Sequence, residues 1–191
     1  MAFVVFDTET TGLPSKFIDA TPSNIKNWDS CRIVQIAWEI YNNSTDTSPV
    51  SSQCYVVSPD GFTIPSKSSS IHGISTEDAL ANGTPISNVI TLFMNDITKH
   101  NVTTAVAHNM SFDSNVFLSE MYRNKFGDVD IWKDLRKHCT MIAGTKRGGR
   151  WPKLNDLYKS LIGPVDNSLI LHRADVDTKL CADIYKVQAS L

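Results

Sequence analysis

The sequence predicts an α/β fold, in which an antiparallel meander of three strands is followed by helices that alternate with short strands. Three observations lead to this fold class. Residues 3–6 form an apolar run, residues 32–41 alternate between apolar and polar side chains, and residues 53–58 return as a third strand after a polar turn. From residue 75 onward apolar residues recur at helical spacing, with a short apolar strand at 103–107 between two helices.

The first strand runs directly into two carboxylates, Asp7 and Glu9. They stand two residues apart, so in an extended chain both side chains leave the same face and can converge on one point. Two buried like charges need a cation, and oxygen ligands suit Mg²⁺ or Mn²⁺ better than zinc. The alternative is a strand that simply ends in a polar turn formed by residues 10–12.

Composition indicates an ordinary soluble protein and one domain spanning residues 1–191, with 41% hydrophobic and 20% charged residues. The formal charge of −2 provides no overall field that attracts nucleic acid. A polyanionic substrate would therefore depend on bound metal or on a local basic patch.

The four cysteines are scattered and form no Cys-x-x-Cys pair, so we expect reduced core thiols and no zinc site. No signal peptide is visible, and no apolar run approaches about 18 residues. We therefore expect a cytoplasmic protein without a membrane segment.

The segments between the strands and helices also carry signals. Residues 13–30 are too polar for a core element, although Leu13 forms an exposed apolar pair with Pro14 beside the carboxylates. Residues 75–78 resemble a helix start, and a second helix should begin with Thr84 as N-cap and Pro85 at its first position, with apolar residues through Ile97 on one face.

A third helix should follow the strand at 103–107, with Ser111 as its cap and an end near Gly127. Asp113 would then lie in the first helical turn just past a strand end, where ligands bind in α/β sheets. Residues 154–161 predict a short helix, and the last helix opens at His172 and carries an apolar face formed by Val176, Leu180, Cys181, Ile184 and Val187.

Residues 146–153 contain four basic side chains, one tryptophan and no acid. One interpretation is a solvated flexible loop. The other is a loop that follows the phosphates of a nucleic acid and offers a stacking residue.

Three patterns occur in order along the chain: Asp7-x-Glu9, then His108-Asn109-x-x-Phe112-Asp113, then His172-x₄-Asp177. Together they resemble the three exonuclease motifs of the DEDD superfamily, histidine type, which includes the proofreading subunit of bacterial DNA polymerase III and ribonuclease T. The tyrosine-type branch would have tyrosine where this sequence has Arg173. The resemblance spans nearly the whole chain.

The resemblance implies a ribonuclease H-like fold, with a mixed five-stranded sheet, the first three strands antiparallel, and helices on both faces. We expect the fifth strand near residues 138–142. The implied activity is 3′–5′ exonucleolytic hydrolysis of phosphodiester bonds with two divalent metal ions, Mg²⁺ or Mn²⁺, releasing nucleoside 5′-monophosphates.

The resemblance also implies residue roles. Asp7, Glu9 and Asp177 would hold the metal that carries the attacking water. Asp7 would bridge to the second metal with help from Asp113, and His172 would be the general base. Thr10, Thr11 and Leu13 would border the 3′-terminal nucleotide, with Leu13 wedging its base, and the further candidates for this pocket are His72, Asn109 and Phe112.

The expected substrate is the 3′ end of single-stranded or frayed DNA. An exoribonuclease is the alternative, because no motif reads the 2′-hydroxyl. A catalytically silent nucleic-acid-binding or polymerase-associated module is a second alternative, but such a module has no need for five converging catalytic groups. The chain shows no tail for docking on a polymerase, so we expect a stand-alone enzyme; a polymerase partner and the oligomeric state stay open.

Overall fold

Five strands form one mixed sheet of order β3-β2-β1-β4-β5 in the computed structural model, which describes residues 1–145, 149–166 and 168–190. Strands β1, β2 and β3 are antiparallel, whereas β1 pairs with β4 and β4 with β5 in parallel. The predicted mixed sheet is confirmed. The strand bounds are β1 Phe3–Thr10, β2 Ile33–Tyr41, β3 Ser51–Val56, β4 Thr104–Ala107 and β5 Arg136–Cys139.

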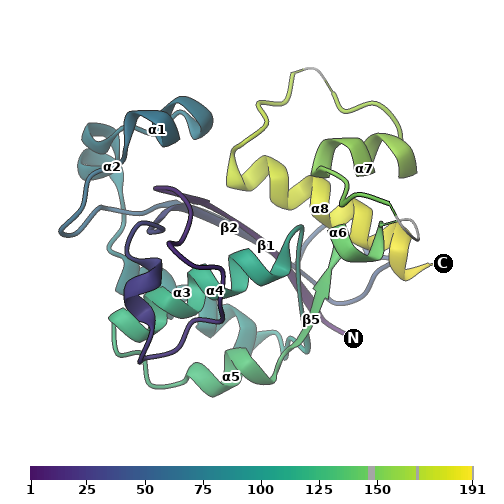
Figure 1. The fold of residues 1–191 in the computed structure, drawn as a ribbon. Coiled ribbons are helices and arrows are strands. Elements are labelled where there is room, and N and C mark those ends of the chain that lie inside the picture. Colours follow the sequence, from purple (N-terminus) through teal and green to yellow (C-terminus); the bar gives the residue numbers. More distant parts are fainter. Residues whose placement is uncertain (146–148, 167, 191) are drawn as a thin grey trace.

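Helices cover both faces of this sheet (Figure 1). Helix α8 packs on β1 and β2 from one side, while α3, α4 and α5 contribute to the larger core on the other. Among the described residues, no helix combines the length and the apolar character needed to cross a membrane. The helices are η1 Ile25–Trp28, α1 Ser66–His72, α2 Thr76–Asn82, α3 Ile86–Lys99, α4 Met110–Arg123, α5 Val129–Asp134, α6 Thr140–Ala143, α7 Leu154–Leu161 and α8 Ala174–Ala189.

The two faces of β1 belong to different cores. Val4 and Phe6 pack in the larger core, where Phe6 meets the ring of Trp132 edge-on at 5.2 Å between centroids. Phe3 and Val5 pack on the opposite face against residues of α8. Because side chains alternate along a strand, the positions that follow Val5 on its face, 7 and 9, also point toward α8.

Strand β1 is longer than its parallel neighbour. It pairs with β4 only over Phe3–Val5, but with β2 from Phe3 to Thr10. The last half of β1 therefore extends past the end of β4, and α4 begins just beyond that end. This is the kind of crevice, at the carboxyl ends of strands, in which α/β proteins bind ligands.

Several predicted segments were wrong in detail. The segment 13–30 does contribute to the core, because Trp28 in η1 is 1% exposed. Helix α1 was not predicted at all. Cys54 is exposed rather than a core thiol, and Val176 is only half-buried. Helix α8 begins at Ala174, so His172 precedes it.

Element boundaries also differ from the predictions. The third and fifth strands lie about two residues earlier, and α3 begins at Ile86, with Pro85 rather than Thr84 at the N-cap position. Ser111 does not cap α4, because Asn109 occupies the N-cap position in a left-handed conformation. Helix α4 ends at Arg123, and a separate short helix, α5, follows it.

Candidate functional site

Two carboxylates of β1 meet a third from α8. Oxygen atoms of Asp7, Glu9 and Asp177 all lie within 4.8 Å of one another. Asp7 and Glu9 come together because they share the α8 face of β1. The prediction that these three side chains converge therefore agrees with the geometry. Asp175, two residues before Asp177, is outside this group and pairs with Arg173 at 3.1 Å.

Helix α8 is fixed on the sheet by polar contacts in its first turns. The backbone N–H of Ala174 donates to Oε1 of the buried Gln35 at 3.0 Å, and the Thr178 hydroxyl donates to the carbonyl of Ala37 at 3.3 Å. Both acceptors belong to β2. These bonds set the position of Asp177, which lies between the two donors along the helix.

Asp113 approaches the same cavity from α4. It is 4% exposed, and its Oδ1 accepts a bond from the Thr8 hydroxyl at 2.7 Å and from the Thr8 backbone N–H at 3.2 Å. Thr8 lies on the α4 side of β1, between Asp7 and Glu9. Its role was missed in the sequence, because nothing local to either residue predicts a bond across 105 positions.

The cavity that these acids line has a volume of about 220 Å³. His172 also lines it, with an exposed side chain and a backbone φ of 63°. Asn109 lines it with a φ of 97°. Left-handed conformations are rare in residues other than glycine and cluster at functional sites, where the surrounding structure maintains them.

Burial disfavours the ionised form of the four acids and so raises their pKa values. It raises the pKa of Asp7 well above its usual range, that of Glu9 and of Asp113 to about 7, and that of Asp177 to about 6. Repulsion by neighbouring carboxylates adds to the effect at Asp7 and Glu9, while the Thr8 hydrogen bonds lower the pKa of Asp113. A cation would offset both the burial and the repulsion.

The donor set fits a hard divalent cation. All the donors are carboxylate oxygens, which Mg²⁺ and Mn²⁺ prefer. Oδ1 of Asp177 is buried without a hydrogen-bond partner among the described residues. Such an acceptor is expensive to bury unless a ligand satisfies it.

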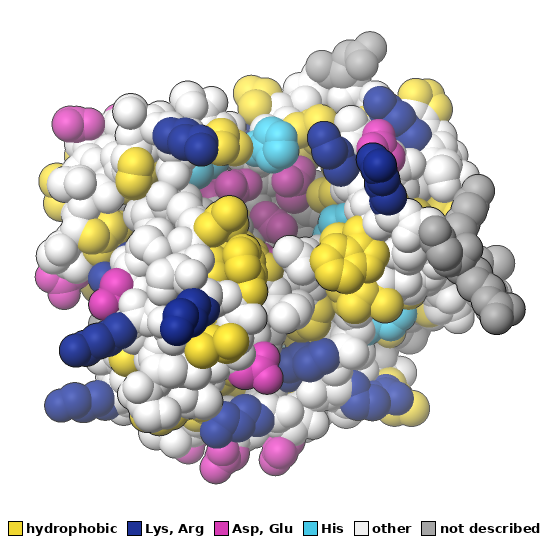
Figure 2. Space-filling model, in the orientation of Figure 1, with side chains coloured by type: hydrophobic (Ala, Val, Ile, Leu, Met, Phe, Trp, Pro, Cys, Tyr) yellow, Lys and Arg dark blue, Asp and Glu magenta, His cyan; other side chains and the backbone are white. Residues whose placement is uncertain are grey.

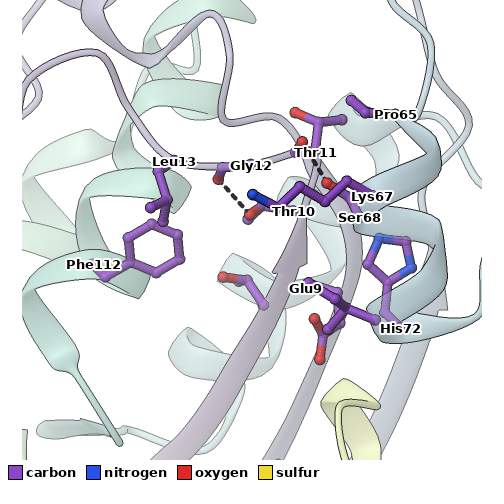
Figure 3. A pocket seen from close by; sticks show the side chains of 12 residues that line it. Glu9, Thr10, Thr11, Gly12, Leu13, Pro65, Lys67, Ser68, His72 and Phe112 are labelled. Carbon is purple, nitrogen blue, oxygen red and sulfur yellow. Dashed lines mark hydrogen bonds between the residues drawn. The ribbon is translucent and has the colours of Figure 1, made fainter.

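A larger cavity of about 570 Å³ adjoins the acids, and Glu9 lies at its edge (Figure 3). Most of the predicted pocket residues line it: Thr10, Thr11, Leu13, His72 and Phe112. Asn109 does not, because it lines the acidic cavity instead. Figure 3 shows the ring of Phe112 close to Leu13 on one side of the cavity and α1 on the other, with Pro65, Lys67 and Ser68.

Thr11 shapes this cavity rather than offering its hydroxyl to a ligand. Its Oγ1 donates to the carbonyl of Ser30 at 3.0 Å and accepts from the N–H of Arg32 at 2.9 Å. Its carbonyl accepts from the hydroxyl of Ser68 in α1 at 2.6 Å. Helix α1 is thereby attached to the end of β1, so the unpredicted helix forms one wall of the cavity.

The basic segment 146–153 is described only in part, and residues 146–148 lie outside the described residues. Arg150, Trp151 and Lys153 are exposed. Lys153 lines a further cavity of about 440 Å³ together with His172 and Asp177. Figure 2 shows the acidic side chains at the bottom of a hollow, with hydrophobic side chains beside it and basic ones near its rim.

Comparisons with known proteins agree with this geometry. The sequence profile of one family, described as the RNase_T exonuclease family, matches residues 4–185. E. coli Exonuclease I in complex with a dT13 oligonucleotide is similar in fold, with a TM-score of 0.72 and 20% identity over 97% of this chain. The zinc-bound form of the E. coli Exonuclease I complex with single-stranded DNA has a TM-score of 0.71 and is 19% identical over 99% of this chain.

The present chain covers only 40% of each of these two Exonuclease I chains. At such identities the likeness concerns the fold alone. No curated protein sequence matched this chain.

Proposed function

Because this chain belongs to the RNase_T exonuclease family, we propose that it is a metal-dependent 3′–5′ exonuclease of the histidine type. It would release nucleoside 5′-monophosphates from the 3′ end of single-stranded or frayed DNA. The observation that carries the proposal is the convergence of Asp7, Glu9 and Asp177 within 4.8 Å, in a cavity that His172 also lines. In metal-dependent hydrolysis of a phosphodiester, such carboxylates can hold the cations and a histidine can accept the proton of the attacking water.

The acids are proposed to hold two divalent cations, Mg²⁺ or Mn²⁺. Asp7, Glu9 and Asp177 would ligate the first, and Asp7 and Asp113 the second. When bound, the cations would supply a nucleophile derived from water and stabilise the negative charge that develops on the phosphoryl and leaving oxygens. The two bonds from Thr8 leave Oδ2 of Asp113 available as a ligand.

His172 is proposed as the general base. Histidine can accept a proton near neutral pH, and a general base must lie within reach of the attacking water. The side chain of His172 is exposed to solvent, so the proton that it takes can leave between turnovers. Its backbone is left-handed shortly before α8, and His172 lines the same cavity as Asp177, which supports this role.

The 570 Å³ cavity is proposed to take the 3′-terminal nucleotide. Its volume is typical of small-molecule sites, and it opens beside Glu9. Leu13 is 64% exposed, as a wedge against a base requires, and Phe112 lies next to it. Thr10, Thr11 and His72 would form the remaining surface, while Asn109 would contact the substrate from the acidic cavity.

DNA is the proposed substrate because the Exonuclease I structures with this fold contain DNA oligonucleotides. RNA is the alternative substrate. A catalytically silent binding module is the less favoured function, because the chain has all four acids and His172. We further propose that residues 1–191 form one exonuclease domain, since the family profile reaches from residue 4 to residue 185.

The test is digestion of matched single-stranded DNA, mismatched duplex DNA and RNA, each labelled at the 5′ end, with Mg²⁺, Mn²⁺ or EDTA. A ladder that shortens from the 3′ end only with metal supports the proposal. Asp7→Asn should abolish it, whereas Asp175→Asn serves as the matched control because Asp175 lies outside the cluster. If Asp7→Asn keeps a tenth of the turnover or more, the assignment is wrong.

A further inference from the structure

His108 connects the end of β4 to the segment before α7. Its Nδ1 lies 2.9 Å from Oγ1 of Thr140, and its Nε2 lies 3.1 Å from the carbonyl oxygen of Pro152. These partners are 32 and 44 residues away in sequence. The same histidine lines the acidic cavity of 220 Å³.

The partners determine the protonation of His108. A carbonyl oxygen can only accept, so Nε2 carries the hydrogen and donates it to Pro152, and Nδ1 of the neutral ring accepts from the Thr140 hydroxyl. Burial lowers the pKa of His108, which favours this neutral form. Both ring nitrogens are therefore engaged, and neither is free to act on a substrate.

The segment that His108 holds carries a large exposed aromatic ring. Trp151 is 69% exposed, whereas Trp28, Trp38 and Trp132 are at most 1% exposed. Its neighbour Arg150 is exposed, as is Lys153, which lines the 440 Å³ cavity with His172 and Asp177. We call residues 149–153 the Trp151 arm.

An exposed tryptophan among basic residues, one of which lines a cavity, has the composition of a single-strand binding element. Bases stack on aromatic side chains without sequence preference, and basic side chains contact the phosphates between them. The 570 Å³ cavity lies on the α1 side of the acids, while the arm adjoins them through Lys153 on the α7 side. A nucleic-acid strand whose 3′-terminal nucleotide fills the 570 Å³ cavity would have its preceding nucleotides outside that cavity.

We propose that the Trp151 arm is a second nucleotide-binding element, in which Trp151 stacks on a base on the 5′ side of the terminal nucleotide, and that His108 is the positioning residue that holds the arm beside the acidic cavity. This inference rests on the proposed function for the direction of the strand. It adds a binding role for Trp151 and an indirect role for His108.

Binding can be measured without turnover. Since Trp151 alone among the four tryptophans is accessible, adding a single-stranded hexanucleotide in EDTA should quench its fluorescence, and Trp151→Ala should abolish the quenching. Loss of one stacked base should weaken hexanucleotide binding roughly 5- to 150-fold. A nucleoside 5′-monophosphate, which has no base on its 5′ side and can fill only the terminal cavity, should bind both proteins equally.

Kinetics test the role of His108. His108→Ala should raise KM for the hexanucleotide with kcat nearly unchanged, and should add little further effect in the Trp151→Ala background, because both changes remove the same contact. His108→Gln, whose amide can reach the Pro152 carbonyl, should recover most of the affinity; His108→Asn, which is too short, should not. His138→Ala is the matched control, since His138 is a part-buried histidine bonded to Gln188 at 3.1 Å.

Equal hexanucleotide binding by the Trp151→Ala variant and the wild type would overturn the stacking role. A fall in kcat for His108→Ala, or an undiminished rise in KM in the Trp151→Ala background, would overturn the positioning role. A protein that binds through Trp151 yet degrades no substrate with any metal would instead contradict the proposed exonuclease activity and leave the arm intact. Thermal unfolding of each variant guards against loss of fold.

Discussion

Thr8 donates two hydrogen bonds to a single oxygen of Asp113, one from its hydroxyl and one from its backbone N–H. The bonds join β1 to α4 at the point where β1 has no parallel strand beside it, because its pairing with β4 has already ended. They orient Asp113 and lower its pKa against the larger effect of burial.

Thr8→Val should impair metal use rather than folding. The substitution keeps the shape and the backbone bond but removes the hydroxyl, so the pKa of Asp113 rises further. A hydrogen bond to a charged group contributes about 1.5–3 kcal/mol, and we expect the Mg²⁺ concentration for half-maximal activity at pH 7 to increase roughly 10-fold or more. Thr8→Ser retains the hydroxyl and is the control; an equal defect in both variants would mean that the bond to Asp113 is unimportant.

The metal-free protein should lose stability as the pH rises from about 4 to about 7. The pKa values of Glu9 and Asp113 are raised to about 7, so between these limits the folded protein binds more protons than the unfolded chain. The free energy of unfolding therefore falls through this window. Thermal unfolding in EDTA across this pH range measures the effect.

Asp7→Asn should raise the Tm of the metal-free protein at pH 8, by about 2–4 °C for each kcal/mol of repulsion that it removes. Added Mg²⁺ should stabilise the wild type at that pH and the variant much less, because a ligand stabilises only the form that binds it. A metal-free protein that became steadily more stable from pH 4 to pH 7 would contradict the prediction that ionisation of the buried carboxylates destabilises the fold.

His172 and Asp177 should fail in different ways. His172→Ala should lose roughly 10²- to 10⁴-fold in kcat, the usual size of a general-base contribution, while Mg²⁺ still raises its Tm. Asp177→Asn should lose the stabilisation by Mg²⁺ together with activity. Turnover and metal titration of both variants, with Asp175→Asn as control, separate these roles; an active Asp177→Asn beside an inactive Asp175→Asn would show that the motif had been aligned wrongly.

Glu120→Ala should destabilise the protein by about 3–5 kcal/mol, the cost of breaking a buried ion pair from one side. Glu120 is 1% exposed and accepts from Arg32 Nε at 2.6 Å, and its Oε1 also lies 3.4 Å from Arg123 Nη1. Arg32 in turn donates its N–H to Thr11, so the loss should also raise KM through the wall of the terminal cavity. Denaturant unfolding together with KM checks both effects. A stable variant with unchanged KM would contradict the predicted connection from Glu120 through Arg32 to the wall of the terminal cavity.

The sequence predicted the sheet because its signals are local. The apolar run of β1 and the alternation of β2 are visible in consecutive residues, and α2 begins within the predicted helix start 75–78, where the Ser75 hydroxyl accepts from the N–H of Asp78 at 3.0 Å. Strand periodicity predicted that Asp7 and Glu9 share one face, whereas Asp177 was identified through the resemblance of its motif to those of the DEDD exonucleases.

What the sequence could not supply were elements stabilised by distant contacts. Helix α1 has the sequence Ser-Lys-Ser-Ser-Ser-Ile-His, without apolar periodicity, and depends on the bond from Ser68 to Thr11 and on Gly73, whose φ of 75° ends the helix. Trp28 is buried from within a polar segment for a similar reason, since its partners are contributed by the larger core. Tertiary contacts therefore stabilise helix α1 and bury Trp28, and neither is visible in the local sequence.

The alternation of side chains along β1 leaves the strand no tolerance for a change in its length. One residue inserted between Val5 and Asp7 would turn both acids toward the face of Val4 and away from α8, although composition and charge would hardly change. Two inserted residues would restore the face but advance the acids by about 7 Å along the strand. The proposed metal site therefore depends on the number of residues between the part of β1 that pairs with β4 and the acids, as much as on the chemistry of the acids themselves.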